Sequence, residues 1–133
     1  MSKRTILFVD DDRDFLRAQE AWFGAKGYRV LTAESGDQAI ELLLTETPDI
    51  IFLDLMMEHY DSGFQLSHKL RKDPKLASVP MVMLSGVAAA TGQRFDNHPD
   101  SLKSWSKLDG FVDKPVTSKQ LLKEVQERLG EEA

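Results

Sequence analysis

Polar side chains able to bind a cation and a phosphoryl group follow the short apolar runs of this sequence. The residues in these positions are Asp10, Asp11, Asp12, Asp54, Ser85, Asp113 and Lys114. Carboxylates bind hard cations, and a carboxylate can also act as a nucleophile. A hydroxyl and an ammonium group can stabilise the charge of a phosphoryl group. The chemistry of phosphoryl transfer is therefore available if the apolar runs are neighbouring strands.

The apolar runs alternate with longer amphipathic segments, which predicts an α/β fold. The predicted strands are 6–9, 28–32, 50–53, 81–84 and 111–112. Continuous apolar strands separated by helices indicate a parallel sheet covered on both faces. In such sheets the functional cleft lies beyond the carboxyl ends of the strands. We therefore expect the polar residues that follow the strands to meet at one edge.

The amphipathic segments carry helix start and stop signals. The first has an apolar stripe that we expect to be buried and that Gly27 ends; its members are Phe15, Ala18, Trp22 and Ala25. Ser35 with Gln38, and Thr117 with Gln120, have the spacing of capping boxes. A further helix carries Leu66 and Leu70, and the least periodic stretch, 87–99, precedes a short helix that we expect to begin near Pro99.

Composition narrows the class of protein. The chain has 133 residues, which predicts one domain. Its 22 acidic and 17 basic residues give a net charge of −5, which disfavours direct nucleic-acid binding through bulk charge. Cysteine is absent, which excludes disulfides and thiolate metal sites. No apolar run approaches the length of a membrane span, and no leader pattern is visible, so we expect a cytoplasmic protein with no membrane association.

The crowded aspartates indicate a metal site. Asp10, Asp11 and Asp54 would share one end of the sheet, where like charges destabilise the fold unless a cation intervenes. Carboxylates with backbone carbonyls and water form a site suited to Mg²⁺. Lys114 supplies a fixed cation at the same edge, and Ser85 supplies a hydroxyl donor.

These residues resemble the receiver domain of two-component response regulators, of the CheY-like type. The resemblance is carried by the run from Ile6 to Asp11, by Asp54, by Ser85-Gly86 and by Lys114-Pro115. It covers about 5–129 and implies one receiver domain over 1–133. It also implies a doubly wound (βα)5 flavodoxin-like sandwich, with a five-stranded parallel sheet of order 2-1-3-4-5.

The resemblance implies a role for each of the site residues. Asp54 would be the phosphoacceptor. Asp10, Asp11, Asp54 and the backbone carbonyl of Met56 would bind Mg²⁺. Lys114 and Ser85 would contact the phosphoryl group, with the bond before Pro115 in the cis form. Ser85 and Phe111 would change position when the domain is activated.

The resemblance also implies a signalling switch rather than a turnover enzyme. A sensor histidine kinase or a phosphotransfer protein would donate the phosphoryl group in a Mg²⁺-dependent reaction. Output would pass to a downstream partner, to an output domain absent from this chain, or to a phosphorylation-dependent homodimer. The sequence departs from the family at Glu58, where proline is usual, in a loop at 58–63 that is one residue longer, and in the long segment 87–99.

Other interpretations of the same residues remain open at this point. A small haloacid-dehalogenase-type phosphatase would use Asp10 as nucleophile and Asp12 as its partner, although Asp14 stands where that family has threonine or valine. The aspartates could also be ordinary helix caps. A flavin-binding module is excluded, because three aspartates would repel the flavin phosphate. The complete acid set argues against a receiver that never accepts phosphate. The phosphatase and the receiver differ in whether Asp10 or Asp54 carries the phosphoryl group.

Overall fold

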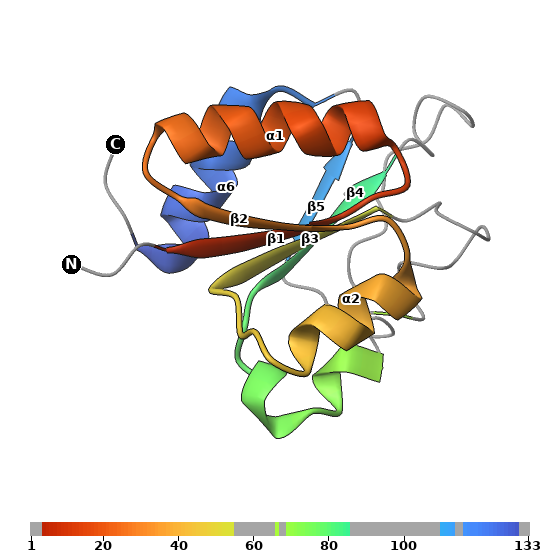
Figure 1. The fold of residues 1–133 in the computed structure, drawn as a ribbon. Helices are drawn as coiled ribbons and strands as arrows, with labels where there is room; N and C mark the ends of the chain where they lie inside the picture. Colours follow the sequence, from red (N-terminus) through yellow and green to blue (C-terminus); the bar gives the residue numbers. More distant parts are fainter. Residues whose placement is uncertain (1–3, 55–65, 67–68, 86–109, 114–115, 131–133) are drawn as a thin grey trace.

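Five short strands form a parallel sheet at the centre of the molecule (Figure 1). The computed structural model describes residues 4–54, 66, 69–85, 110–113 and 116–130, with the side chains of Ser85, Phe111 and Asp113 left out. The strands are β1 (Thr5–Val9), β2 (Arg29–Ala33), β3 (Ile50–Asp54), β4 (Met81–Ser85) and β5 (Gly110–Asp113). They pair in the order β2-β1-β3-β4-β5. The predicted flavodoxin-like α/β architecture with a parallel sheet is confirmed.

Helices cover both faces of this sheet. The described elements are α1 (Arg13–Ala25), α2 (Gly36–Leu43), the 3₁₀ helix η1 (Pro74–Leu76) and α6 (Ser118–Leu129). Helices α1 and α6 lie on one face, and α2 lies on the other (Figure 1). None of the described helices is long and apolar enough to cross a membrane.

Alternating residues of the central strands supply two separate cores. In β1, Ile6 and Phe8 face the core under α1 and α6, while Leu7 and Val9 face the core under α2. The strand β3 alternates in the same way, and all its apolar side chains are fully buried. Because both faces are covered, these strands are apolar throughout rather than alternating in polarity.

Stacked aromatic rings fill the core under α1. The rings of Phe8 and Phe52 lie parallel, with centroids 5.1 Å apart. Phe23 of α1 lies 5.6 Å from Phe8, and Phe15 meets Phe8 edge-on at 6.2 Å. The contacts join β1, β3 and α1 into one layer, because each ring touches Phe8.

The buried face of α1 differs from the predicted one. Its buried residues are Leu16, Gln19 and Phe23, whereas Ala18 and Ala25 are exposed. Phe15 and Trp22 are only half-buried, and Lys26 covers the Trp22 ring at 4.7 Å. Phe15 and Trp22 still pack against the core, so the prediction was wrong only for Ala18 and Ala25. Phe23 packs on Phe8, and this rotation of the helix turns the two alanines outward.

The predicted start of β2 also differs in detail. Strand β2 begins at Arg29 rather than Tyr28, because the Tyr28 N–H donates to the Phe23 carbonyl in the turn that ends α1. Gly27 adopts a positive φ of 95° in that turn, as expected of a residue just beyond a helix.

The caps of α2 and α6 differ in completeness. Thr117 and Gln120 form the reciprocal box that was predicted for α6. Ser35 accepts from the Gln38 N–H, but Gln38 Oε1 accepts from the N–H of Glu34 rather than Ser35. The predicted box at Ser35 is therefore only half formed, because the glutamine reaches one residue further back.

Charged side chains connect neighbouring strands at the edge of the sheet where the strands begin. Arg29 Nη1 lies 2.5 Å from Glu46 Oε2, which joins β2 to the connection before β3. Asp49 accepts from the Thr5 N–H at 2.7 Å and lies 3.8 Å from Arg4. These contacts fix where β1, β2 and β3 start relative to one another.

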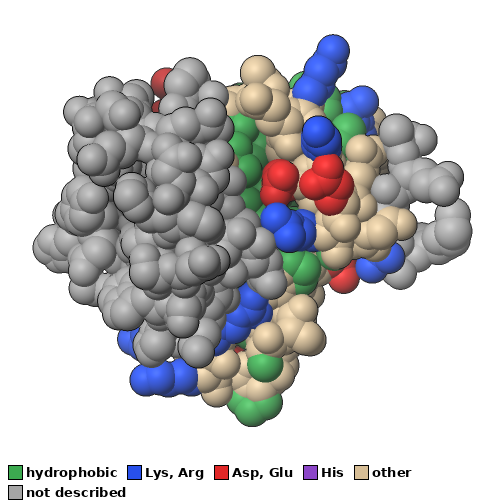
Figure 2. Space-filling model, turned by 180° about the vertical axis from the view of Figure 1, so that it is seen from behind, with side chains coloured by type: hydrophobic (Ala, Val, Ile, Leu, Met, Phe, Trp, Pro, Cys, Tyr) green, Lys and Arg blue, Asp and Glu red, His purple; other side chains and the backbone are tan. Residues whose placement is uncertain are grey.

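Two cations hold the connection that leads into β4. Arg71 Nη1 donates to the carbonyls of Leu76, Ala77 and Val79. Lys75 donates to the carbonyl of Leu43 at the end of α2, where a positive charge also suits the helix dipole. Elsewhere on the surface, basic and acidic side chains lie beside one another, as the described part of the face in Figure 2 shows.

Replacing Phe52 by alanine tests how much the stacked aromatic rings contribute to the stability of the fold. Phe52 is fully buried against Phe8, so the cavity should lower the free energy of unfolding by about 3–5 kcal/mol. Urea unfolding measures this loss. Phe15→Ala is the matched control, because its ring is only half-buried at the edge of the same layer and should cost less. Equal losses of unfolding free energy in the two variants would show that the stacked pair contributes no more than the half-buried ring of Phe15.

The pair of Arg29 and Glu46 predicts a response to acid. The hydrogen bond from Arg29 holds the pKa of the Glu46 carboxyl below its ordinary value of 4.5. Its contribution to stability is therefore present above the unfolded pKa and is lost as the pH falls through the folded pKa. Glu46→Gln should make the melting temperature fall less between about pH 5 and about pH 3. Arg29→Met should weaken the pH dependence of the melting temperature in the same way. An unchanged pH dependence in both variants would contradict the prediction.

Candidate functional site

Three aspartates come together at the carboxyl edge of the sheet. Strands β1 and β3 pair in parallel, with Val9 opposite Leu53. Asp10 and Asp11 follow β1, and Asp54 is the last residue of β3. One ligand oxygen from each of the three carboxylates lies within 4.8 Å of the others. The predicted meeting of these side chains is therefore present in the structure.

The three carboxylates differ in their exposure to solvent. Asp10 is 1% exposed and Asp54 is 5% exposed, whereas Asp11 is on the surface. Burying carboxylates is costly unless charge or hydrogen bonds compensate them. An exposed carboxylate beside two buried ones leaves the cluster accessible from solvent on the Asp11 side. This arrangement suits a small cation that arrives from water.

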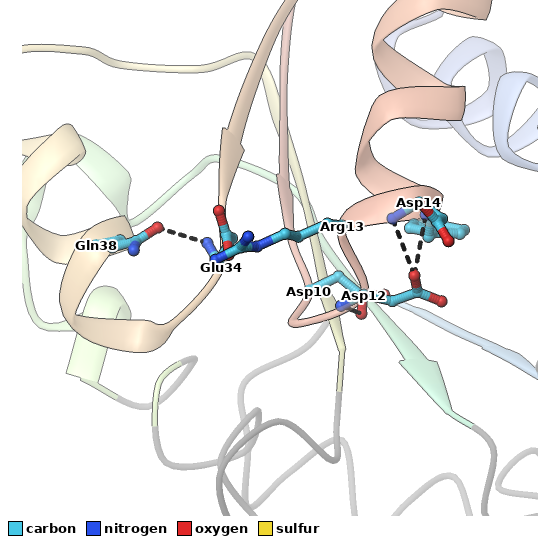
Figure 3. A network of polar contacts seen from close by, with 7 residues as sticks. Asp10, Asp12, Arg13, Asp14, Glu34 and Gln38 are labelled. Atoms are coloured by element: carbon cyan, nitrogen blue, oxygen red, sulfur yellow. Dashed lines mark hydrogen bonds and ion pairs between the residues drawn. The ribbon is translucent and has the colours of Figure 1, made fainter.

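The main chain holds Asp10 from two directions. The Asp10 N–H donates to the Ala33 carbonyl of β2 at 3.0 Å. Asp10 Oδ1 accepts from the Asp12 N–H at 2.9 Å (Figure 3). The carboxylate is therefore oriented by the turn between β1 and α1.

Asp12 has a different role from its two neighbours. Its side chain is the N-cap of α1 and accepts from the N–H groups of Asp14 and Phe15 at 3.1 and 3.2 Å. The interpretation that the aspartates are ordinary helix caps is therefore right for Asp12, but not for Asp10 and Asp11. Asp10 and Asp11 instead belong to the cluster with Asp54.

A polar network next to the cluster was not predicted from the sequence. Arg13 Nε lies 2.6 Å from Glu34 Oε1, and the Glu34 N–H donates to Gln38 Oε1 at 2.8 Å (Figure 3). The network joins the start of α1 to the start of α2, on either side of β2. The only signal for it in the sequence is a glutamate placed directly before the Ser35 cap.

The strand register brings other predicted residues to the same edge. Asp54 lies opposite Leu84 in the β3–β4 pair, and Ser85 lies opposite Asp113 in the β4–β5 pair. The backbone of Ser85 thus ends β4 at the same edge at which Asp54 ends β3. Phe111 lies within β5, with only its backbone described.

The remaining predictions fall outside the described residues. They concern Met56, Glu58 with the loop 58–63, the segment 87–99, the helix near Pro99, and Lys114 with the bond before Pro115.

A family model described as the response regulator receiver domain matches residues 6–126. Similar curated proteins include PilH of Pseudomonas aeruginosa, which is 30% identical over 90% of this chain and 93% of its own length. PleD of Caulobacter vibrioides is 34% identical over 94% of this chain but only 26% of its own length. The phosphate regulon regulator PhoB of P. aeruginosa is 32% identical over 98% of this chain and 55% of its own length. The chain thus spans only part of PleD and PhoB.

Solved structures give the same fold. The chemotaxis response regulator CheY4 of Vibrio cholerae matches with a TM-score of 0.82 and 22% identity, over 96% of this chain and 99% of CheY4. The receiver domain of the Francisella response regulator 1452 matches with a TM-score of 0.78 and 26% identity, over 96% and 98% of the two chains. The haloacid-dehalogenase alternative is not favoured, since these matches and the capping role of Asp12 both point elsewhere. The chain belongs to the response regulator receiver domain family.

Proposed function

We propose that Asp54 is the phosphoacceptor of this receiver domain. The observation that carries the proposal is the cluster of Asp10, Asp11 and Asp54 at the carboxyl edge. Asp54 is the member that ends a central strand of the sheet, away from the run of aspartates before α1. We extend the proposal to a single domain over 1–133 with the complete (βα)5 arrangement and strand order 2-1-3-4-5.

The residues of the cluster fit a bound Mg²⁺. The donor set consists of carboxylate oxygens, which are the ligands that hard divalent cations prefer. Asp10, Asp11 and Asp54 would hold the ion, with the carbonyl of Met56 as a further ligand. When bound, Mg²⁺ would neutralise charge on the carboxylates and on the phosphoryl group. Two of the three ligands are already fixed within buried surroundings, so little reorganisation is needed.

The protein residues would position the phosphoryl transfer. An oxygen of Asp54 would form the new bond to phosphorus as the phosphorus–nitrogen bond of a donor phosphohistidine breaks. The donor would be a sensor histidine kinase or a phosphotransfer protein. Lys114 and the Ser85 hydroxyl would contact the phosphoryl oxygens. The contribution of the receiver is therefore alignment and charge, as in other phosphoryl transfers.

The transferred group would act as a signal rather than as an intermediate in turnover. A phosphoryl group adds nearly two negative charges at this edge. Ser85 and Lys114 would be drawn toward it, and Phe111 would repack in response. Phosphorylation would thus shift an existing equilibrium between two conformations.

Several partners fit such a switch. PleD and PhoB are longer than this chain, so output through an attached domain or a separate partner is part of the proposal. A phosphorylation-dependent homodimer is another form of output. A cytoplasmic location would give access to the kinase.

Changing Asp54 to asparagine tests the phosphoacceptor. The unaltered protein should gain one phosphoryl group from acetyl phosphate and Mg²⁺, measured by intact mass, and Asp54→Asn should gain none. Asp37→Asn is the matched control, because it removes one exposed carboxylate from α2 without touching the cluster. A phosphoryl group found on Asp10 would refute the assignment and would favour the phosphatase alternative. Undiminished labelling of Asp54→Asn would also refute the assignment.

Changing Asp11 to alanine tests the metal site. Mg²⁺ should raise the melting temperature of the unaltered protein, because a ligand at 100 times its dissociation constant stabilises by about 2.7 kcal/mol. Asp11→Ala should lose most of this rise, measured by thermal unfolding with and without Mg²⁺. Asp12→Asn is the matched control, since it removes a charge from the same run and keeps a good cap for α1. An equal loss of the rise in both variants would indicate general charge screening instead.

A further inference from the structure

Gln19 is a buried polar side chain that the acidic site does not use. The buried polar or charged side chains among the described residues are Thr5, Asp10, Gln19 and Asp54. Gln19 lies in α1 and is 4% exposed. A buried amide is costly unless it is hydrogen-bonded, whereas an apolar side chain would fill the same place without that cost. Its partner therefore indicates what the amide contributes.

That partner is the first residue of α6. Gln19 Oε1 accepts a hydrogen bond from Ser118 Oγ at 2.8 Å, across 99 positions of the sequence. Ser118 directly follows Thr117, whose complete capping box fixes the start of the helix. Helices α1 and α6 lie side by side on the same face of the sheet (Figure 1). The hydrogen bond therefore ties the beginning of α6 to the body of α1.

Both tied segments lead to the proposed phosphorylation site. The N-cap of α1 is Asp12, whose N–H donates to the Asp10 carboxylate. On the other side, only Lys114 and Pro115 separate the end of β5 at Asp113 from Val116, which packs against the core under α1 and α6. Asp10 and Asp11 precede α1 in the sequence and Lys114 precedes α6, so Gln19 and Ser118 join the two helices that follow these residues.

We propose that Gln19 is a positioning residue for Lys114, acting through Ser118 and the start of α6. This inference depends on the proposed function, because it assigns the hydrogen bond a role in phosphoryl transfer to Asp54. Apolar packing between α1 and α6 would hold the helices together without fixing how far α6 slides along α1. A hydrogen bond between the buried Gln19 and the partly buried Ser118 has a preferred length and direction, and it removes that freedom.

The rate of phosphorylation by acetyl phosphate at saturating Mg²⁺ tests the proposal. Ser118→Ala and Gln19→Leu should each slow uptake by roughly three- to tenfold, because small misplacements of a positioned group are costly in rate. The double variant should be no slower than the slower single variant, because each change removes the same contact. Ser118→Thr keeps the hydroxyl and should restore the rate. The Mg²⁺ affinity, measured by thermal shift, should stay unchanged, since the acids lie at the ends of β1 and β3 rather than on α6.

Val125→Ala is the matched control for stability. It loosens the buried side of α6 beyond its first turn and leaves the hydrogen bond in place. Urea unfolding measures the free energy of unfolding of each variant, so that phosphorylation rates can be compared at equal stability. A rate for Ser118→Ala equal to that of the unaltered protein, or to that of Val125→Ala at equal stability, would show that the contact is merely structural and would overturn the proposal.

A Lys114→Ala background tests the route. There, Ser118→Ala should not slow the remaining uptake further, and a further loss would show that the contact acts on something other than Lys114. The unaltered protein separates this inference from the function on which it depends. If it takes up no phosphoryl group on Asp54, the proposed function fails. If it does and the Ser118 and Gln19 variants match it, only the role of Gln19 fails.

Discussion

Repulsion among three carboxylates is the constraint on which the arrangement of this molecule depends. Asp10, Asp11 and Asp54 place ligand oxygens within 4.8 Å of one another, and two of the three side chains are buried. Such a cluster is unfavourable for the fold by itself and favourable for a cation. A cation bound between them would offset this repulsion, so the proposed Mg²⁺ would stabilise the fold on binding and couple the fold to its ligand.

The sheet supplies the rigidity that keeps the cluster together. Strands β1 and β3 are buried on both faces, and the stacked rings of Phe8 and Phe52 join them in one core. Carboxylates at the ends of such strands cannot move apart without disturbing that packing. Close packing thus offsets the local repulsion, and the cluster stays ready for a ligand.

The sequence predicted the structure best at the ends of the apolar runs. It predicted the structure least well where a polar residue is buried within a helix. The positions of Asp10, Asp11 and Asp54 follow from the strand ends alone. The burial of Gln19 does not, because a hydrophobic stripe is defined by apolar residues and Phe23 sets the helix rotation. The pairing of Arg13 with Glu34 also escaped prediction, since it depends on how far apart α1 and α2 begin. The roles of Lys114, Ser85 and Phe111 remain predictions drawn from resemblance.

The clustered aspartates have an electrostatic consequence for any ligand that approaches the domain. Asp10, Asp11 and Asp54 gather negative charge at the carboxyl edge of the sheet, whereas acids and bases lie beside one another at the opposite edge, as in the pairs Arg4–Asp49 and Arg29–Glu46. The field at the proposed site would attract a metal ion and would repel an anionic phosphodonor until the acids are neutralised. That field would favour an order of arrival, with the cation first and the phosphoryl group second.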